Sequence, residues 1–194
     1  RAGRMYARAR RYCLRALGTA HTRLADALVR EPQAALPLLE STANSDVPAL
    51  FWAGAAWGGE LALAPDQLVR IPELAIVRAL LDRAISLDEG WGGGTIHEAM
   101  IALEGLPALL GGSSARARQH FDRALALSNG ESAFSYVTLA SSVSLRAKDR
   151  SEFERLLKQA LAIDTARRRD LRLANLVAQR RARFLLSSTD RLFK

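Results

Sequence analysis

The hydrophobic pattern of this chain repeats. Three segments carry apolar residues at the three- and four-residue spacing of an amphipathic helix, and they align on a central alanine: Ala84, Ala124 and Ala160. A large apolar residue stands three positions before each alanine, and another stands three positions after it. Small alanines allow a neighbouring helix to approach, and the large residues fill the groove between repeats. The pattern is therefore typical of the second helix of a tetratricopeptide-type repeat.

Each of these helices is preceded by another apolar segment, so we expect three helical hairpins. The expected hairpins span about residues 47–87, 93–127 and 132–163. Capping helices are expected over residues 2–40 and 168–188. Because no useful length of chain alternates with a period of two, the sequence predicts an all-α fold. We expect a tetratricopeptide-like helical-hairpin repeat solenoid that forms a single domain over residues 1–194.

The two terminal helices are expected to turn apolar faces inward. In the first, over residues 2–17, helical spacing predicts a face formed by Tyr6, Ala9, Cys13 and Leu17. The same helix carries a separate stripe of arginines, three or four residues apart, at positions 4, 8, 11 and 15. In the last helix, the face expected to contact the core is formed by Leu173, Leu176, Val177 and Phe184. Its arginines at positions 180, 181 and 183 are expected to contact acidic helices or solvent.

The longest apolar stretch, Val47 to Ala64, is 18 residues long and has one charge, Glu60. That length is close to what a membrane span needs. Three glycines lower its hydrophobicity, however, and Pro48 and Pro65 bracket it. We therefore expect a buried helix.

Composition changes this picture in one respect, the distribution of charge. The 194 residues hold 28 Lys+Arg and 20 Asp+Glu, with 49% hydrophobic and 25% charged residues, which is ordinary for a folded protein and excludes bulk disorder. The first 30 residues carry a net charge of +7, residues 31–166 carry −6, and residues 167–194 carry +7. Basic ends around an acidic middle indicate that the ends pack against the middle or meet an anionic partner.

Most catalytic and metal-binding signatures are absent from the sequence. No Gly-rich phosphate loop or Cys-x-x-Cys pair is present, and the single Cys13 forms no disulfide within the chain. His97-Glu98 begins like a zinc-protease helix, but Ile101 stands where the second His is needed. A Ser-His-Asp arrangement stays open, although no Gly-x-Ser-x-Gly elbow is present. We expect no cofactor, no metal site and no catalysis.

Nucleic acid is not an expected partner, despite the sequence pI of about 10.7. Aromatic residues make up 6% of the chain, and the basic ends do not interleave them as a single-strand groove would. A protein that binds nucleic acid through its basic ends is kept as an alternative function.

A ligand-binding pocket is the remaining candidate site. Trp52 and Trp57 are five residues apart on one expected helix, so they point about 140° apart, one toward the core and one toward a groove. First helices of repeats line the concave surface of a solenoid. The pocket is expected to be lined by Trp52, Trp57, Trp91, His97, Glu98 and Tyr136. The alternative is that most of these residues are packing residues of the core.

Several blocks of the chain resemble the T component associated with tripartite ATP-independent periplasmic (TRAP) transporters, the TatT family. The matching blocks are residues 6–17, 47–57, 80–89, 94–98, 117–125, 149–157 and 172–186. The blocks with the two tryptophans and at the two ends are more specific than the middle blocks, which carry general repeat signal. The proline often expected after the helix ends is replaced by Glu89, Asn129 and Thr165.

This resemblance implies a non-catalytic periplasmic accessory protein of helical repeats. It implies a partner, the substrate-binding P subunit of the transporter, and a ligand that is a small hydrophobic or organic-acid molecule. It also implies a homo-oligomer, with a trimer favoured. The sequence shows no lipobox cysteine, so a lipid anchor on a longer precursor is left as an alternative. A general tetratricopeptide-like scaffold for protein–protein interaction is the alternative function.

Overall fold

The computed structural model describes residues 1–63 and 70–194, and within these ranges every regular element is a helix and none is a strand. This confirms the all-α prediction. The expected helix boundary at Pro65 and the rest of residues 64–69 lie outside the described residues. The chain divides into two compact units, Arg1–Trp91 and Gly92–Lys194. One continuous repeat domain over residues 1–194 stays a prediction.

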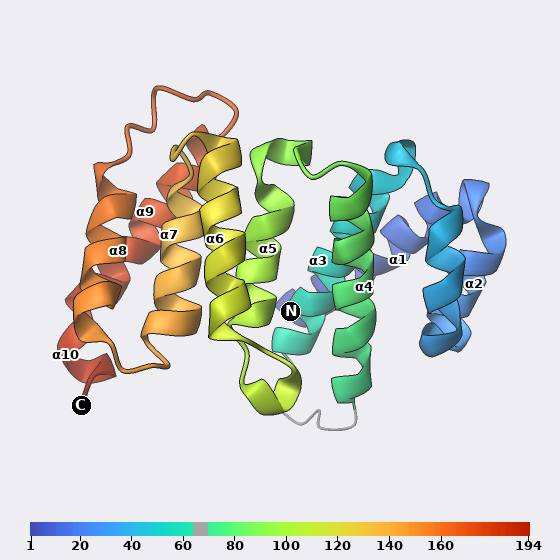
Figure 1. The fold of residues 1–194 in the computed structure, drawn as a ribbon, viewed down its shortest axis with the longest axis horizontal. Helices are drawn as coiled ribbons and strands as arrows, with labels where there is room; N and C mark the ends of the chain where they lie inside the picture. The colour runs from blue at the N-terminus through green and yellow to red at the C-terminus, as the bar shows by residue number, and fades with distance from the viewer. Residues whose placement is uncertain (64–69) are drawn as a thin grey trace. The chain divides into compact units, whose positions relative to one another are not determined.

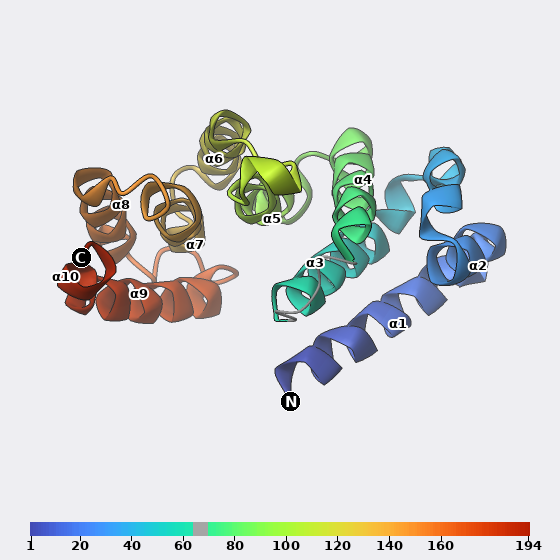
Figure 2. The same ribbon diagram turned by 90° about the horizontal axis from the view of Figure 1, so that it is seen from below.

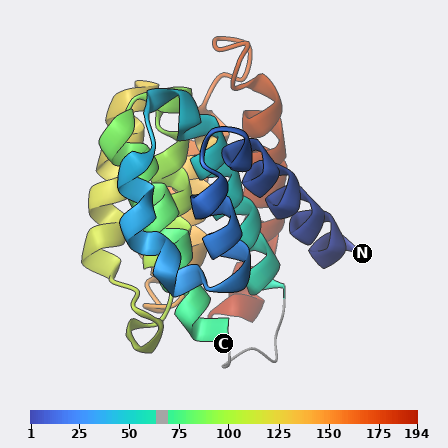
Figure 3. The same ribbon diagram turned by 90° about the vertical axis from the view of Figure 1, so that its right-hand side faces the viewer.

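The first unit is formed by α-helices and short 3₁₀ segments that pack against one another (Figures 1 and 3). Its α-helices are α1 (Ala2–Ala20), α2 (Thr22–Arg30), α3 (Val47–Ala62) and α4 (Ile71–Leu87). Two 3₁₀ segments, η1 (Pro32–Ser41) and η2 (Asn44–Asp46), connect α2 to α3. Helix α3 packs between α1 and α4. Helix α2 packs against α1 and η1.

The second unit places α5, α6, α7 and α8 side by side (Figure 1). Its α-helices are α5 (Thr95–Glu104), α6 (Ser114–Ser128), α7 (Ala133–Leu139), α8 (Arg150–Ala162), α9 (Arg172–Ser187) and α10 (Thr189–Leu192). A π-helical segment, η6 (Ala140–Ser144), continues α7, and a 3₁₀ turn, η5 (Ala108–Leu110), follows α5. Helix α9 lies across the α7/α8 pair (Figure 2).

The three expected hairpins correspond to packed helix pairs, α3 with α4, α5 with α6 and α7 with α8. The aligned alanines Ala84, Ala124 and Ala160 are all buried. At Ala124 the approach is closest: a Cβ on Gly94 would lie 3.0 Å from the Ala124 carbonyl oxygen, and Gly94 has a left-handed φ of 98°. Only a small residue on each side allows α5 to begin against α6. Whether the pairs continue as a repeat solenoid stays a prediction.

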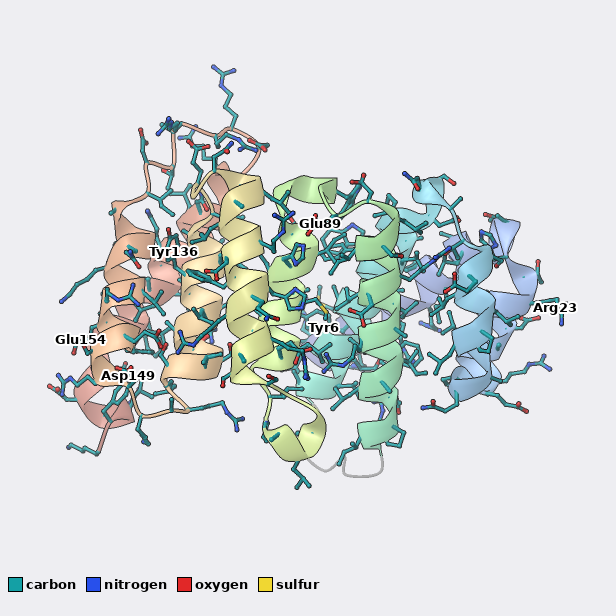
Figure 4. The ribbon with its side chains drawn as sticks, in the orientation of Figure 1. Tyr6, Arg23, Glu89, Tyr136, Asp149 and Glu154 are labelled. Atoms are coloured by element: carbon teal, nitrogen blue, oxygen red, sulfur yellow. The ribbon has the colours of Figure 1, made fainter. Side chains whose placement is uncertain are left out.

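Helix α1 turns only part of the expected face inward. Leu14 and Leu17 are buried, whereas Tyr6 and Ala9 are exposed and Cys13 is only half-buried. The prediction was right for Leu17 and wrong for the other three residues, because the inward face includes Arg10, which pairs with Glu60 of α3. Tyr6 (labelled in Figure 4) still contacts α3 from the edge, since a Cβ on Gly59 would lie 2.6 Å from its ring. The arginines at positions 4, 8, 11 and 15 are exposed, as expected.

Helix α9 also corrects the sequence prediction. Leu173, Leu176, Val177 and Phe184, expected in the core, are all exposed. The face that packs on α7 and α8 is instead formed by Asn175, Ala178, Gln179, Ala182 and Leu185. The small side chains of this face allow close packing against α7 and α8. Its amide side chains form hydrogen bonds with backbone groups at the ends of these two helices.

The apolar stretch that starts at Val47 forms α3, whose side chains at Leu50, Phe51 and Trp57 are buried. Within residues 1–63 and 70–194, none of the helices has the length and apolarity that crossing a membrane requires. The expectation of a buried helix is confirmed for the described part of this stretch.

Candidate functional site

Trp57 is a core residue of the first unit. It is 1% exposed, and the Arg10 guanidinium lies 4.4 Å from its ring centroid, which is a cation–π distance. Its indole Nε1–H donates a hydrogen bond of 2.5 Å to Glu73 Oε2. The expectation that one of the two tryptophans packs in the core is therefore confirmed, and that residue is Trp57.

Charged side chains surround Trp57 and join α1, α3 and α4. Arg70 donates to both Glu73 and Glu60, and Arg10 Nε lies 3.1 Å from Glu60 Oε2. Burial alone would raise the pKa of Glu73, but the hydrogen bonds from Arg70 and Trp57 hold it below its usual value. These paired charges hold the Trp57 indole in place, so the charged residues around Trp57 have a structural role.

Trp52 has the opposite surroundings. It is 55% exposed and its ring packs edge-on against Phe51, with 4.8 Å between the ring centroids. Phe51 in turn lies 5.0 Å from the Trp91 ring, again between centroids. We call Phe51, Trp52 and Trp91 the aromatic cluster. It brings together the beginning of α3 and the segment that follows α4, and its exposed ring is that of Trp52.

Phe51 was missed by the sequence reasoning. Its position next to Trp52 was visible, but its contact with Trp91, 40 residues later, depends on how α3 packs against the end of α4. The Phe51 ring packs against the rings of both Trp52 and Trp91, and because Phe51 is 3% exposed it offers little surface of its own.

His97 and His120 meet inside the second unit. Their Nδ1 atoms are 2.8 Å apart, and His97 is 3% exposed. One Nδ1 donates and the other accepts, so at least one ring is neutral. The sequence separates the two residues by 23 positions, and α5 and α6 bring them together. Within the described residues, no group of three or more His, Cys, Asp or Glu side chains is placed to hold a metal ion.

Glu98, the next residue of α5, contacts the start of α7. Its Oε1 accepts hydrogen bonds from Ser135 Oγ, at 2.8 Å, and from Ser132 Oγ. Both serines are buried. Burial raises the pKa of the Glu98 carboxyl above its usual value, and the two hydroxyls only partly offset this effect. Glu98 thus links two hairpins through a buried polar contact.

Tyr136 (labelled in Figure 4) lies on α7, where its ring packs edge-on against Phe121 of α6, 5.3 Å between centroids. Burial raises the pKa of its phenol. Its role in the second unit is packing between hairpins.

The six expected pocket residues are therefore divided between the two units. The three tryptophans belong to the first unit, and His97, Glu98 and Tyr136 belong to the second. Within the first unit, the exposed part of the set is Trp52. Within the second, His97 contacts His120 of α6, whereas Glu98 contacts Ser132 and Ser135 at the start of α7. A ligand-binding role for these residues stays a prediction.

The chain matches known proteins along its whole length. The sequence model of a family described as TAtT, TRAP transporter T-component, matches residues 1–193. An uncharacterized protein of Treponema pallidum (strain Nichols) is 24% identical over 195 residues. That similarity covers 100% of this chain and 60% of the Treponema protein, so the chain spans about three-fifths of its relative.

Proposed function

This chain belongs to the TRAP transporter T-component family, and on that premise we propose that it is a periplasmic accessory protein that binds the substrate-binding P subunit of its transporter. Family membership implies association with a TRAP transporter and a non-catalytic role. The match over residues 1–193 is the observation that carries the proposal. The proposal includes assembly into a homo-oligomer, with a trimer favoured.

The ligand of the proposed function is a small hydrophobic or organic-acid molecule, and the aromatic cluster is its first contact. Binding sites for such molecules are mostly apolar and contain few polar anchors. Trp52 supports this role because it is an exposed, rigid aromatic ring backed by Phe51. Trp57 does not share the role, because its ring and its N–H are both engaged within the core.

Binding to the P subunit tests the first part of the proposal. The purified chain is titrated with a P subunit from the same genome, and the heat of binding is measured. A saturable interaction with fixed stoichiometry is expected. No binding across the micromolar range would favour the alternative function, a general scaffold for protein–protein interaction.

Substitution of Trp52 tests the second part. A medium-chain fatty acid should bind the unmodified chain in a calorimetric titration, and Trp52→Ala should weaken that binding by about 2 kcal/mol or more if Trp52 is an anchor. Trp57→Phe removes the buried tryptophan instead and serves as the matched control, which should keep the affinity. Equal affinities for the unmodified chain and Trp52→Ala would remove Trp52 from the site.

A further inference from the structure

Helix α9 carries an apolar face that its own unit leaves uncovered. Leu173 is 76% exposed, Val177 57% and Phe184 62%. At 100° per residue, these three side chains and Leu176 fall within an arc of roughly 100°. Arg180 falls in the middle of the same arc. We call these five residues the outer face of α9.

The opposite face of α9 holds the helix firmly in place. Gln179 Nε2 donates to the carbonyl oxygens of Ala160 and Ile163 at the end of α8, at 3.1 and 2.8 Å. Asn175 accepts from the Ala133 N–H at the start of α7 and donates to the Glu131 carbonyl oxygen. These contacts satisfy helix ends, so α9 is fixed in orientation. The outer face is turned away from the α7/α8 pair (Figure 2).

The charge of α9 indicates the chemistry of a partner that would cover this face. Helix α9 contains four arginines, Arg172, Arg180, Arg181 and Arg183, and no acid. All four are exposed, and none forms an ion pair with an acid in residues 1–63 or 70–194. A partner with an apolar groove bordered by carboxylates would cover the apolar side chains and form ion pairs with the arginines.

A second copy of the chain that packs through the same helix does not supply such a groove. In a symmetric pair through α9, Arg180 is near the midpoint of the helix and would meet Arg180 of the other copy, which is a like-charge contact. Acids of the chain's middle are in large part already engaged within the chain. Among the described residues, acids with an ion pair to arginine include Glu40, Glu60, Glu73, Glu104, Glu131, Glu152 and Glu154.

A lipid surface is also a poorer fit than a protein. Helices that lie on membranes keep their charges on the polar side of the helix, away from the inserted apolar face. Here Arg180 lies within the apolar arc. Arginine and phenylalanine are instead among the residue types enriched at protein–protein interfaces.

We propose that the outer face of α9 is a docking surface for an acidic, apolar-lined groove of the substrate-binding P subunit. This inference rests on the proposed function and adds to it the surface and the chemistry of the contact. Phe184 and the leucines enter the groove, and Arg180 meets a carboxylate at its centre. The flanking arginines speed the encounter through electrostatic attraction.

The test measures binding of the P subunit to the full chain and its variants by calorimetry, at low and at high salt. Arg180→Glu and Phe184→Ala are each expected to weaken binding by about tenfold or more. The affinity of the Arg180→Glu variant should also depend less on salt. Arg11→Glu and Tyr12→Ala make the same kinds of change at exposed positions of α1, another basic helix, and should keep the affinity within about twofold. Thermal unfolding monitored by circular dichroism checks that each variant is folded.

Three outcomes would overturn the inference, and they are distinguishable. If the unmodified chain binds no P subunit, the proposed function fails and takes this inference with it. If the unmodified chain binds and the α9 variants bind equally well, or if the α1 variants lose as much affinity, only the inference fails. If the α9 variants dissociate a homo-oligomer yet keep their affinity for the P subunit, the outer face belongs to a second copy of the chain.

Discussion

At the scale of single residues, Trp52 and Trp57 show how far five positions on one helix can separate two identical side chains. Helical geometry requires them to point in different directions, but it does not say which direction is inward. That choice follows from Glu73 of α4 and Arg10 of α1, which reach Trp57 from two neighbouring helices. The polar handle of the indole is thereby satisfied inside the core.

Trp57→Phe should lower the free energy of unfolding by about 2 kcal/mol, because the Glu73 carboxylate loses a donor in a partly buried site and part of the ring volume is lost. Trp52→Phe is the matched control, and since its ring is mostly exposed it should change stability by no more than about 0.5 kcal/mol. Urea unfolding of both variants measures the difference. Equal changes in the free energy of unfolding for the two variants would show that the hydrogen bond from Trp57 to Glu73 does not stabilise the fold.

Glu98→Gln should change how stability depends on pH. A raised pKa in the folded state means that the folded chain binds more protons than the unfolded chain between the two pKa values. Stability from this group is therefore present at acidic pH, below the unfolded pKa of about 4.3, and falls as pH rises through the folded pKa. Gln keeps an oxygen that can accept from Ser132 and Ser135 but cannot ionise.

The free energy of unfolding of the Glu98→Gln variant, minus that of the unmodified chain, should consequently increase with pH above about 4. Urea titrations at a series of pH values from 4 to about 8 give this difference. A difference that stays constant over this range would mean that the buried carboxyl does not titrate differently in the two states.

At the scale of the element, the three aligned alanines were a reliable guide to the helix pairs. Ala124 lies where the backbone of Gly94 comes close to α6, so there is no room for a larger side chain. Ala124→Leu should therefore cost roughly 1–3 kcal/mol through overpacking. Ala126→Leu, two residues further on the exposed side of α6, is the control and should be nearly neutral. Thermal or urea unfolding compares them, and similar losses would contradict the packing role of Ala124.

Helix α9 shows where the same reasoning fails. Its large apolar residues form a true amphipathic stripe, and hydrophobicity alone assigns that stripe to the core. The buried face was decided by Asn175 and Gln179, whose amides bond to backbone groups of α7 and α8. No local pattern in the sequence distinguishes an amide that satisfies a helix end 16 to 42 residues away from one that faces solvent.

At the scale of the whole molecule, the proposed function includes assembly of several copies of the chain. The chain should form a stable homo-oligomer, with a trimer favoured, on the strength of its family. Light scattering at micromolar concentration should give a mass of several times 21.2 kDa. A mass equal to a single chain would contradict the proposed assembly and leave the fold unaffected.

The sequence by itself determined the helical class, the three helix pairs and the family. Helical periodicity, small residues at contact positions and glycine or asparagine at helix ends are local properties, so they can be recognised without knowing what lies opposite. Asn129, for example, ends α6 in the left-handed conformation that its residue type favours.

Only the tertiary structure decided which tryptophan is buried, which face of α9 is outward and which residues meet at the candidate site. Trp57 with Glu73, Phe51 with Trp91, and His97 with His120 are contacts between residues 16, 40 and 23 positions apart. Such pairs form because helix packing brings their elements together, and their energies depend on burial that no single segment possesses. Which candidate residues are exposed and which are buried therefore became visible only once the helices were packed.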